Sequence, residues 1–239
     1  MIKPSDWHLG LIEYVQATNA RETDSEYLRR VGVKPHVLEF CGDASTSAVL
    51  DVGSADGWLL RQLHCRAGYS CDVTLTSGTL AEESFVVASA VALPYREQAF
   101  DLVAASLMLM WLPSLPPAFR EFRRVTRLGG RLVVAIVHPS YYRTGRVERS
   151  GDFTIEQPLG RSWSIADLRI GGRAGPFTYY AHRYADYFTD ALAAGWQLLR
   201  LREWFIDMMD YNANVDVGKQ IVARTDKVPL YVFFEFGAI

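Results

Sequence analysis

Cysteine is scarce in this sequence, and neither sign of charge dominates it. Cys41, Cys65 and Cys71 are odd in number and lack CxxC spacing, so neither a disulfide framework nor a zinc site is indicated. The 25 lysines and arginines are balanced by 27 aspartates and glutamates, for a net charge of −2. This balance argues against a nucleic-acid binder and against a polybasic membrane-surface protein.

Long hydrophobic runs are also missing. The strongest apolar stretch, 102–112, contains Ser106 and is shorter than the ~20 residues that a membrane-spanning helix needs. Residues 1–11 include Asp6 and His8 and no apolar block, unlike a secretory signal. We therefore expect a soluble, cytoplasmic protein that has no membrane partner.

The chain has 239 residues, of which 49% are hydrophobic, enough for the core of one large domain. Short apolar runs alternate with helical patterns through its middle, which predicts a parallel, doubly wound α/β sheet. The predicted strands are 48–52, 72–76, 85–88, 101–106 and 131–137, and the predicted helices between them are 58–67 and 117–126.

The flanking segments differ from the middle of the chain in periodicity and composition. Residues 1–47 predict an N-terminal helical cap before the core at 48–138. Periodicity is lost over 139–178, where glycines and aromatics collect, and such a long irregular segment is typical of a lid or substrate loop. The remainder, 179–239, predicts a helix at 184–194 and an antiparallel pair of closing strands at 197–203 and 230–236.

A loop of small residues is the most informative motif. The segment VLDVGSADGWL at 49–59 is an apolar strand that reaches Asp51, followed by small residues at 53, 55 and 57. Small residues allow a tight turn into a helix and a close approach by a ligand, although a purely structural turn is the alternative. The GxAxG spacing differs from the GxGxxG of dinucleotide-binding proteins, so a nicotinamide cofactor is a poorer interpretation.

Asp51 and this loop resemble motif I of the class I S-adenosylmethionine (SAM) methyltransferases. The segments ALPY…FDLV at 92–103 and EFRRVTRLGGRL at 121–132 resemble later motifs of that family, in the same order and spacing. The resemblance implies a Rossmann-like, seven-stranded, mostly parallel sheet with N-terminal helices and an inserted lid after strand five. It also implies SAM as cofactor, S-adenosylhomocysteine as product, and O- or N-methylation of a small molecule, in secondary metabolism.

The resemblance assigns cofactor contacts to ten positions: Asp51, Gly53, Ser54, Ala55, Gly57, Thr74, Ser89, Ala90, Ser106 and Trp111. Three of them depart from the family pattern. Thr74 falls where the family has the carboxylate that holds the ribose, with Asp72 expected two residues deeper. Ser89 replaces the aspartate that reads adenine, and Ala55 replaces a glycine. Each charge-assisted bond that becomes neutral costs roughly 1 kcal/mol, so we expect weakened or altered cofactor binding.

Two histidines are candidates for the chemistry. His138 ends the fifth predicted strand, at the sheet edge where α/β proteins bind ligands. We expect it to orient or deprotonate the acceptor, supported by Tyr141 and His182. The alternatives are a strand-capping role for His138 and a hydrogen bond from His182 that ties the lid to the core. The HxxxH and HxH spacings of metal sites are absent, so no metal is expected.

Three functions remain open from the sequence. The first is methyl transfer to a small-molecule acceptor. The second is a non-methylating reaction on the same fold, such as cyclisation, isomerisation or elimination, and the third is a non-catalytic partner protein. No nucleic-acid partner is expected, and a homodimer stays open.

Overall fold

The computed structural model describes residues 28–74, 84–139, 169–170, 173–174, 180, 182–205 and 229–239. Seven strands form the main sheet: β1 (Ala44–Val52), β2 (Cys65–Asp72), β3 (Phe85–Val87), β4 (Phe100–Ser106), β5 (Thr126–Val137), β8 (Trp196–Trp204) and β9 (Tyr231–Ala238). The helical elements are η1 (Arg29–Val33), α3 (Lys34–Cys41), α4 (Trp58–Gln62), η3 (Leu109–Trp111), α5 (Pro116–Val125) and α7 (Tyr184–Ala193).

The strand order in the sheet is β3-β2-β1-β4-β5-β9-β8. Neighbours from β3 to β5 pair in parallel, whereas β9 is antiparallel to both β5 and β8. Because β9 reverses direction between them, β8 runs parallel to β5, and both end at the same edge. The predicted seven-stranded, mostly parallel α/β fold with a late antiparallel strand is confirmed.

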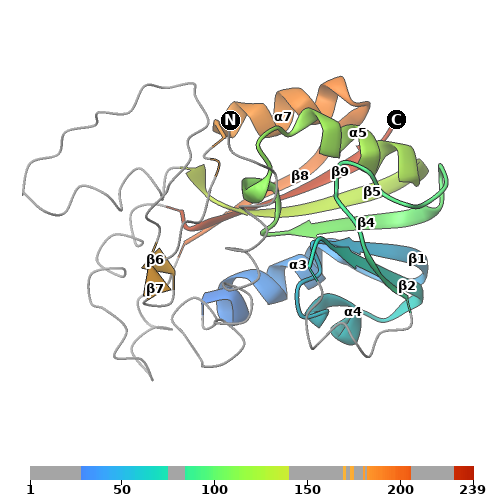
Figure 1. Cartoon of the computed structure of the whole chain (residues 1–239), viewed down its shortest axis with the longest axis horizontal. Helices are drawn as coiled ribbons and strands as arrows, with labels where there is room; N and C mark the ends of the chain where they lie inside the picture. Colours follow the sequence, from blue (N-terminus) through green and yellow to red (C-terminus); the bar gives the residue numbers. More distant parts are fainter. Residues whose placement is uncertain are drawn as a thin grey trace, which may run out of the picture.

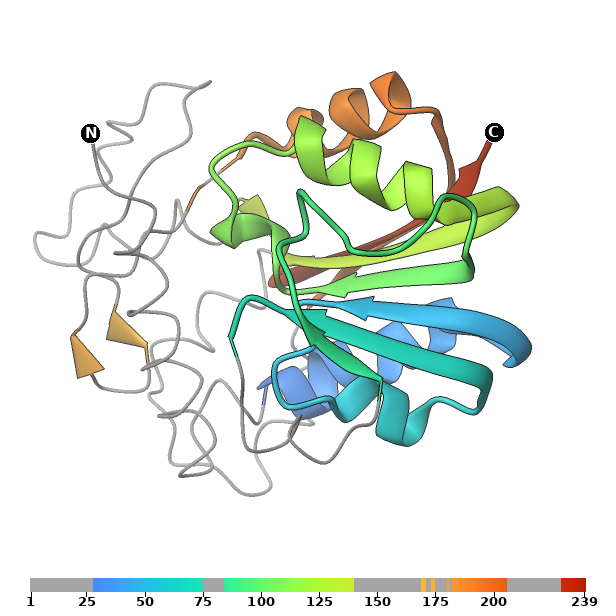
Figure 2. The same ribbon diagram turned by 45° about the vertical axis from the view of Figure 1, so that its right-hand side comes forward.

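Both faces of the sheet are covered, as Figures 1 and 2 show: α3 and α4 lie on one face, α5 and α7 on the other. Because side chains alternate along a strand, successive residues of one strand pack on opposite faces of the sheet. Val49 and Leu102 pack in the cluster with α3, whereas Leu50 and Val103 pack in the cluster with α5. Strands buried on both sides give nearly continuous apolar runs, which is why β1, β4 and β5 were recognisable in the sequence.

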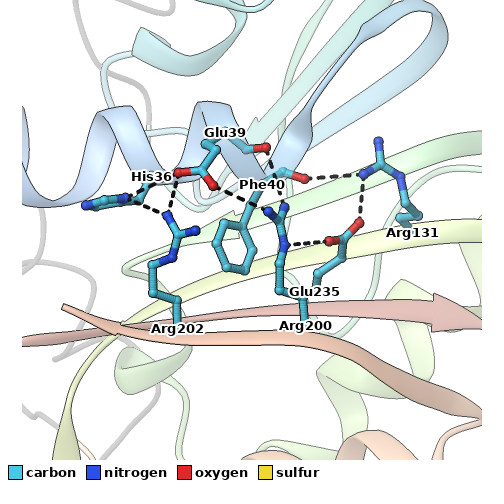
Figure 3. Close-up of polar contacts among 7 residues, drawn as sticks. All are labelled: His36, Glu39, Phe40, Arg131, Arg200, Arg202 and Glu235. Atoms are coloured by element: carbon cyan, nitrogen blue, oxygen red, sulfur yellow. Dashed lines mark hydrogen bonds and ion pairs between the residues drawn. The ribbon is translucent and has the colours of Figure 1, made fainter.

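A network of charged side chains fastens α3 to its face of the sheet (Figure 3). The guanidinium of Arg200 lies 3.7 Å from the centre of the Phe40 ring, and Arg202 forms an ion pair with Glu39. Arg131 donates to the carbonyls of Phe40 and Cys41. The arginines of β5 and β8 thus hold the helix that packs under the parallel strands.

The prediction of strand two at 72–76 is wrong, because β2 covers Cys65–Asp72 and ends where the predicted strand begins. The helix predicted over 58–67 ends earlier, at Gln62, because β2 begins at Cys65. The first five residues of β2 are exposed or half-buried, so they lack the apolar run by which a buried strand is recognised.

Other boundaries extend beyond the predicted ones. β1 begins at Ala44, inside the predicted cap, and β5 begins at Thr126, directly after α5. The rest of the cap up to residue 27 lies outside the described residues, as does most of the predicted lid. Within the lid segment, Arg169–Ile170 and Arg173–Ala174 form a two-stranded sheet (β6 and β7) that was not predicted. No described helix is long and apolar enough to cross a membrane.

Candidate cofactor and acceptor site

The glycine loop lies at the carboxyl edge of the sheet, between the end of β1 and the start of α4. The amides of Gly53 and Ser54 donate to the Cys71 carbonyl at 2.8 and 3.1 Å, which fixes the loop to the end of β2. Gly53 has φ +72°, and a Cβ there would lie 2.6 Å from the Cβ of Met108. Only glycine satisfies both constraints.

The rest of the loop is tightly wound. Ala55 and Gly57 have φ values of +50° and +71°, so both occupy the left-handed region and Ala55 does so at a steric cost. Ser54 is buried, and its hydroxyl has no hydrogen-bond partner within the described residues. A buried polar group of this kind normally finds a partner, and a ligand over the loop would supply one.

Asp72 is the carboxylate that organises this loop. Its Oδ2 accepts from the Ala55 amide at 3.0 Å, and its Oδ1 accepts from the amide and hydroxyl of Thr74, both at 3.1 Å. Burial raises the pKa of Asp72, and these hydrogen bonds oppose that rise. The aspartate is therefore placed to interact with both the loop and a ligand above it.

The expectation that Asp72 lies two residues below the tip of strand two is wrong. Val52, the last residue of β1, pairs with Cys71, and β2 ends at Asp72. Asp72 is thus level with the glycine loop, while Thr74 lies beyond the strand as its buried hydrogen-bond partner. The sequence did offer a signal for this position of Asp72. Asp51 stands near the end of β1, and Asp72 stands in the same way at the end of the neighbouring parallel strand.

Ser89 and Ala90 follow β3, at the same edge of the sheet. Ser89 is half-buried, forms an isolated bridge with Ala92, and accepts from the Val91 amide at 3.4 Å. Ala90 is buried in the core cluster that includes α5. Ser89 is therefore the polar side chain that this short segment contributes near the site.

The Glu121 and Arg124 pair of α5 holds the segment after Ser89. Glu121 accepts from the Leu93 amide at 2.9 Å, and Arg124 donates to the carbonyls of Leu93 and Tyr95 at 2.9 and 2.7 Å. The two side chains also bond to each other at 2.8 Å. Both residues belong to motifs quoted from the sequence, but this role in joining two motifs was not predicted.

The remaining predicted cofactor residues lie at the ends of β1 and β4. Asp51 is buried and pairs in register with Ser70 and Ala104. Ser106 ends β4 and is half-buried, and the turn after it has Leu107 at φ +54°. The Trp111 indole N–H donates to the Leu107 carbonyl at 3.2 Å, so one task of Trp111 is to hold this turn.

His138 is buried directly after β5, and two groups distant in sequence meet it. Its Nε2 lies 3.0 Å from Oε1 of Glu203, and its ring centre lies 5.1 Å from that of Tyr184. Burial lowers the pKa of His138, while Glu203 acts in the opposite direction. Glu203 was not predicted, because nothing in the sequence links positions 65 residues apart.

His182 occupies a different environment. Its Nε2 lies 2.9 Å from the Leu112 carbonyl, which can only accept, so Nε2 carries the proton. Its ring stacks with that of Tyr180 and meets that of Tyr187 edge-on, and burial lowers its pKa. These contacts favour the alternative in which His182 ties neighbouring segments together. Tyr141 lies outside the described residues.

No three potential metal ligands come together within the described residues. Residues 50–134 match the family model for a methyltransferase domain, the part of the chain that carries the glycine loop, Asp72 and Ser89. Over these residues the chain is similar to the methyltransferase domain family. The expected resemblance to class I SAM-dependent methyltransferases is thereby confirmed.

The similar proteins include enzymes of several kinds. Malonyl-[acyl-carrier protein] O-methyltransferase of Erwinia pyrifoliae is 27% identical over 125 residues, 49% of this chain and 47% of that protein. The chain thus spans about half the length of the curated relatives it matches.

Two solved methyltransferase-fold structures are similar at low identity. The N-methyltransferase NodS from Bradyrhizobium japonicum, solved with S-adenosylhomocysteine, has a TM-score of 0.63 at 12% identity, covering 98% of this chain and 99% of its own. The [4+2]-cyclase SpnF has a TM-score of 0.54 at 16% identity, covering 86% and 81%.

Proposed function

We propose that this protein transfers a methyl group from SAM to the oxygen or nitrogen of a small-molecule acceptor. The observation that carries the proposal is the glycine loop with Asp72 beneath it. The loop has no room for a side chain at Gly53, and a carboxylate is held against its backbone. A carboxylate in this place can accept a charge-assisted hydrogen bond from a ribose hydroxyl.

The residues around the loop fit the other parts of SAM. The buried Ser54 hydroxyl offers a donor and an acceptor beside the loop. Ser89 ends the neighbouring segment, where the family reads the adenine amino group. Oδ2 of Asp72 accepts one hydrogen bond, from the Ala55 amide, and so retains acceptor capacity, whereas Oδ1 already accepts two from Thr74. SAM would therefore extend from β1 across the end of β2 towards β3.

The acceptor side of the site is assigned to the end of β5. In methyl transfer the C–S bond of the sulfonium breaks as the bond from methyl carbon to acceptor forms, which requires in-line alignment and exclusion of water. A hydroxyl or protonated amine must also lose a proton. His138, buried at the carboxyl edge, is the group proposed to take it.

A second candidate acceptor comes from the curated relatives, which are named for malonyl-[acyl-carrier protein]. A malonyl thioester ends in a carboxylate that is already ionised at neutral pH, so its methylation needs no base. The two candidates therefore predict different roles for His138.

Both candidates can be tested by measuring S-adenosylhomocysteine release from SAM. The probes are malonyl-N-acetylcysteamine and a panel of phenols, alcohols and amines. For a hydroxyl or amine acceptor, His138→Ala should lower turnover by ~10²–10⁴-fold and leave SAM affinity within a few-fold. Turnover on the malonyl probe alone, insensitive to His138→Ala, would contradict the base-dependent proposal and favour the carboxylate acceptor.

The non-methylating alternative remains relevant because the fold is shared with the cyclase SpnF. Methyl transfer releases one S-adenosylhomocysteine for each product molecule. Product formation without that release would contradict methyl transfer and indicate a different reaction on the same fold.

A further inference from the structure

Three side chains from three elements converge at the carboxyl edge, on the face that carries α7. β5 and β8 run parallel, so His138 after β5 and Glu203 near the end of β8 reach the same edge. Arg202 points to the opposite face, where it pairs with Glu39 of α3 (Figure 3). Alternation along the strand therefore directs Glu203 towards α7.

One oxygen atom joins the three groups. Oε1 of Glu203 lies 3.0 Å from His138 Nε2 and accepts from the Tyr184 hydroxyl at 3.3 Å. The carboxylate only accepts when ionised, so His138 Nε2 carries the proton in this contact. Nδ1 is then the basic nitrogen of the neutral ring.

The members of this group differ in their access to solvent. The His138 side chain is 7% exposed, whereas that of Glu203 is 37% exposed. The carboxylate therefore connects a buried imidazole to solvent. Such a connection stabilises the imidazolium and gives a proton a route out of the site after the acceptor has lost it.

The electrostatics agree with this geometry. Glu203 of β8 and Tyr184 of α7 are two titratable groups that contact the ring. Burial lowers the pKa of His138, and the charge and hydrogen bond of Glu203 raise it. Burial is the larger effect, so the pKa stays below the ordinary value of histidine even with Glu203 present, and loss of Glu203 would lower it further.

We propose that Glu203, supported by the Tyr184 hydroxyl, is the positioning residue that fixes the tautomer of His138 and stabilises its protonated form during catalysis. This inference rests on the proposed function, in which the acceptor proton passes to His138. The proton leaves the acceptor as its bond to the methyl carbon forms, resides on the imidazole opposite Glu203, and is then released to solvent.

The test is histidine NMR, which needs no acceptor. The ¹⁵N shifts of His138 in the parent should show the Nε2–H tautomer when neutral. Glu203→Gln should lower the pKa of His138 by about one pH unit or more, a tenfold change in proton affinity. Glu203→Asp, which keeps the charge, should restore most of that loss.

Two matched variants separate a local effect from a general one. Glu39→Gln removes another partly exposed, ion-paired carboxylate and should leave the His138 pKa within about 0.3 pH units. Tyr184→Phe keeps the ring against His138 but removes the hydroxyl, and should change the pKa less than Glu203→Gln does.

An Nδ1–H tautomer in the parent would overturn the inference without any variant, and so would an unchanged pKa in folded Glu203→Gln. Calorimetry with SAM keeps the two proposals apart. Glu203→Gln should bind SAM within a few-fold of the parent. A parent that binds no SAM would overturn methyl transfer and, with it, the catalytic role of Glu203. This would hold even if NMR confirmed the interaction between His138 and Glu203.

Discussion

Ser89 lies in the segment after β3, and within the part of the chain that the structure describes its short side chain contacts the local backbone. The hydroxyl accepts from the Val91 amide at 3.4 Å. An aspartate could accept from the same amide and still present a second oxygen to the site. The local backbone would therefore accommodate an aspartate, which is a stronger hydrogen-bond acceptor than the serine that is present.

We predict that Ser89→Asp tightens SAM binding by roughly fivefold, because a charge-assisted bond adds about 1 kcal/mol over a neutral one. Titration calorimetry measures the change. Ser89→Asn, similar in size but uncharged, is the matched control and should gain little. Weaker binding by folded Ser89→Asp would mean that Ser89 does not face the adenine amino group.

At the scale of elements, α5 positions the segment that carries Ser89. Arg124 donates to Leu93 and Tyr95 while it bonds to Glu121. These contacts link a helix on one face of the sheet to a loop at the site. The stability of this segment therefore depends on contacts with α5.

Arg124→Gln should destabilise the protein by roughly 1–3 kcal/mol, since several hydrogen bonds to a charged group are lost together. The midpoint of thermal unfolding should fall by roughly 3–10 °C. Arg120→Gln, on the same helix but exposed, should leave the midpoint within about 1–2 °C. An unchanged midpoint for Arg124→Gln would show that the contacts of Arg124 contribute nothing to the stability of the protein.

The same scale explains which elements could be predicted. β1, β4 and β5 are buried on both faces, so their apolar runs identify them. Most of β2 is only partly buried, and its prediction failed by several residues, which misplaced Asp72. One shifted strand was enough to leave Asp72 out of the predicted cofactor contacts.

For the whole molecule, the sequence predicted the order of elements and the edge where the site lies. It could not predict contacts between distant positions, such as Glu203 with His138 or Arg124 with Leu93. Those contacts depend on strand direction and face, which exist only once the sheet has formed. The motifs therefore located the glycine loop, whereas the contact between His138 and Glu203 could be found only in the fold.

Two buried histidines also make the stability of the whole molecule depend on pH. Burial lowers the pKa of His138 and His182, so the unfolded chain binds more protons below its own histidine pKa near 6.5. Stability should therefore decrease as the pH falls from 7.5 to 5.5, by at most about 1.4 kcal/mol per pH unit for each histidine.

Urea unfolding at the two pH values measures this dependence. His182→Gln keeps a donor for the Leu112 carbonyl but cannot titrate, so it should flatten the pH dependence. A parent equally stable at both values, or a variant with an unchanged slope, would contradict the assignment.

The central claim is that SAM binds over the glycine loop and that Asp72 holds it. Calorimetric titration of SAM into the parent, Asp72→Asn and Asp101→Asn tests it most directly. Asp101 is a suitable control because it also accepts from a backbone amide, that of Ala48, but it stands at the start of β4, at the opposite edge of the sheet. We predict one site in the parent, binding weakened tenfold or more by Asp72→Asn, and Asp101→Asn within about twofold of the parent. Absence of binding to the parent, or equal affinity for the parent and Asp72→Asn, would contradict the account.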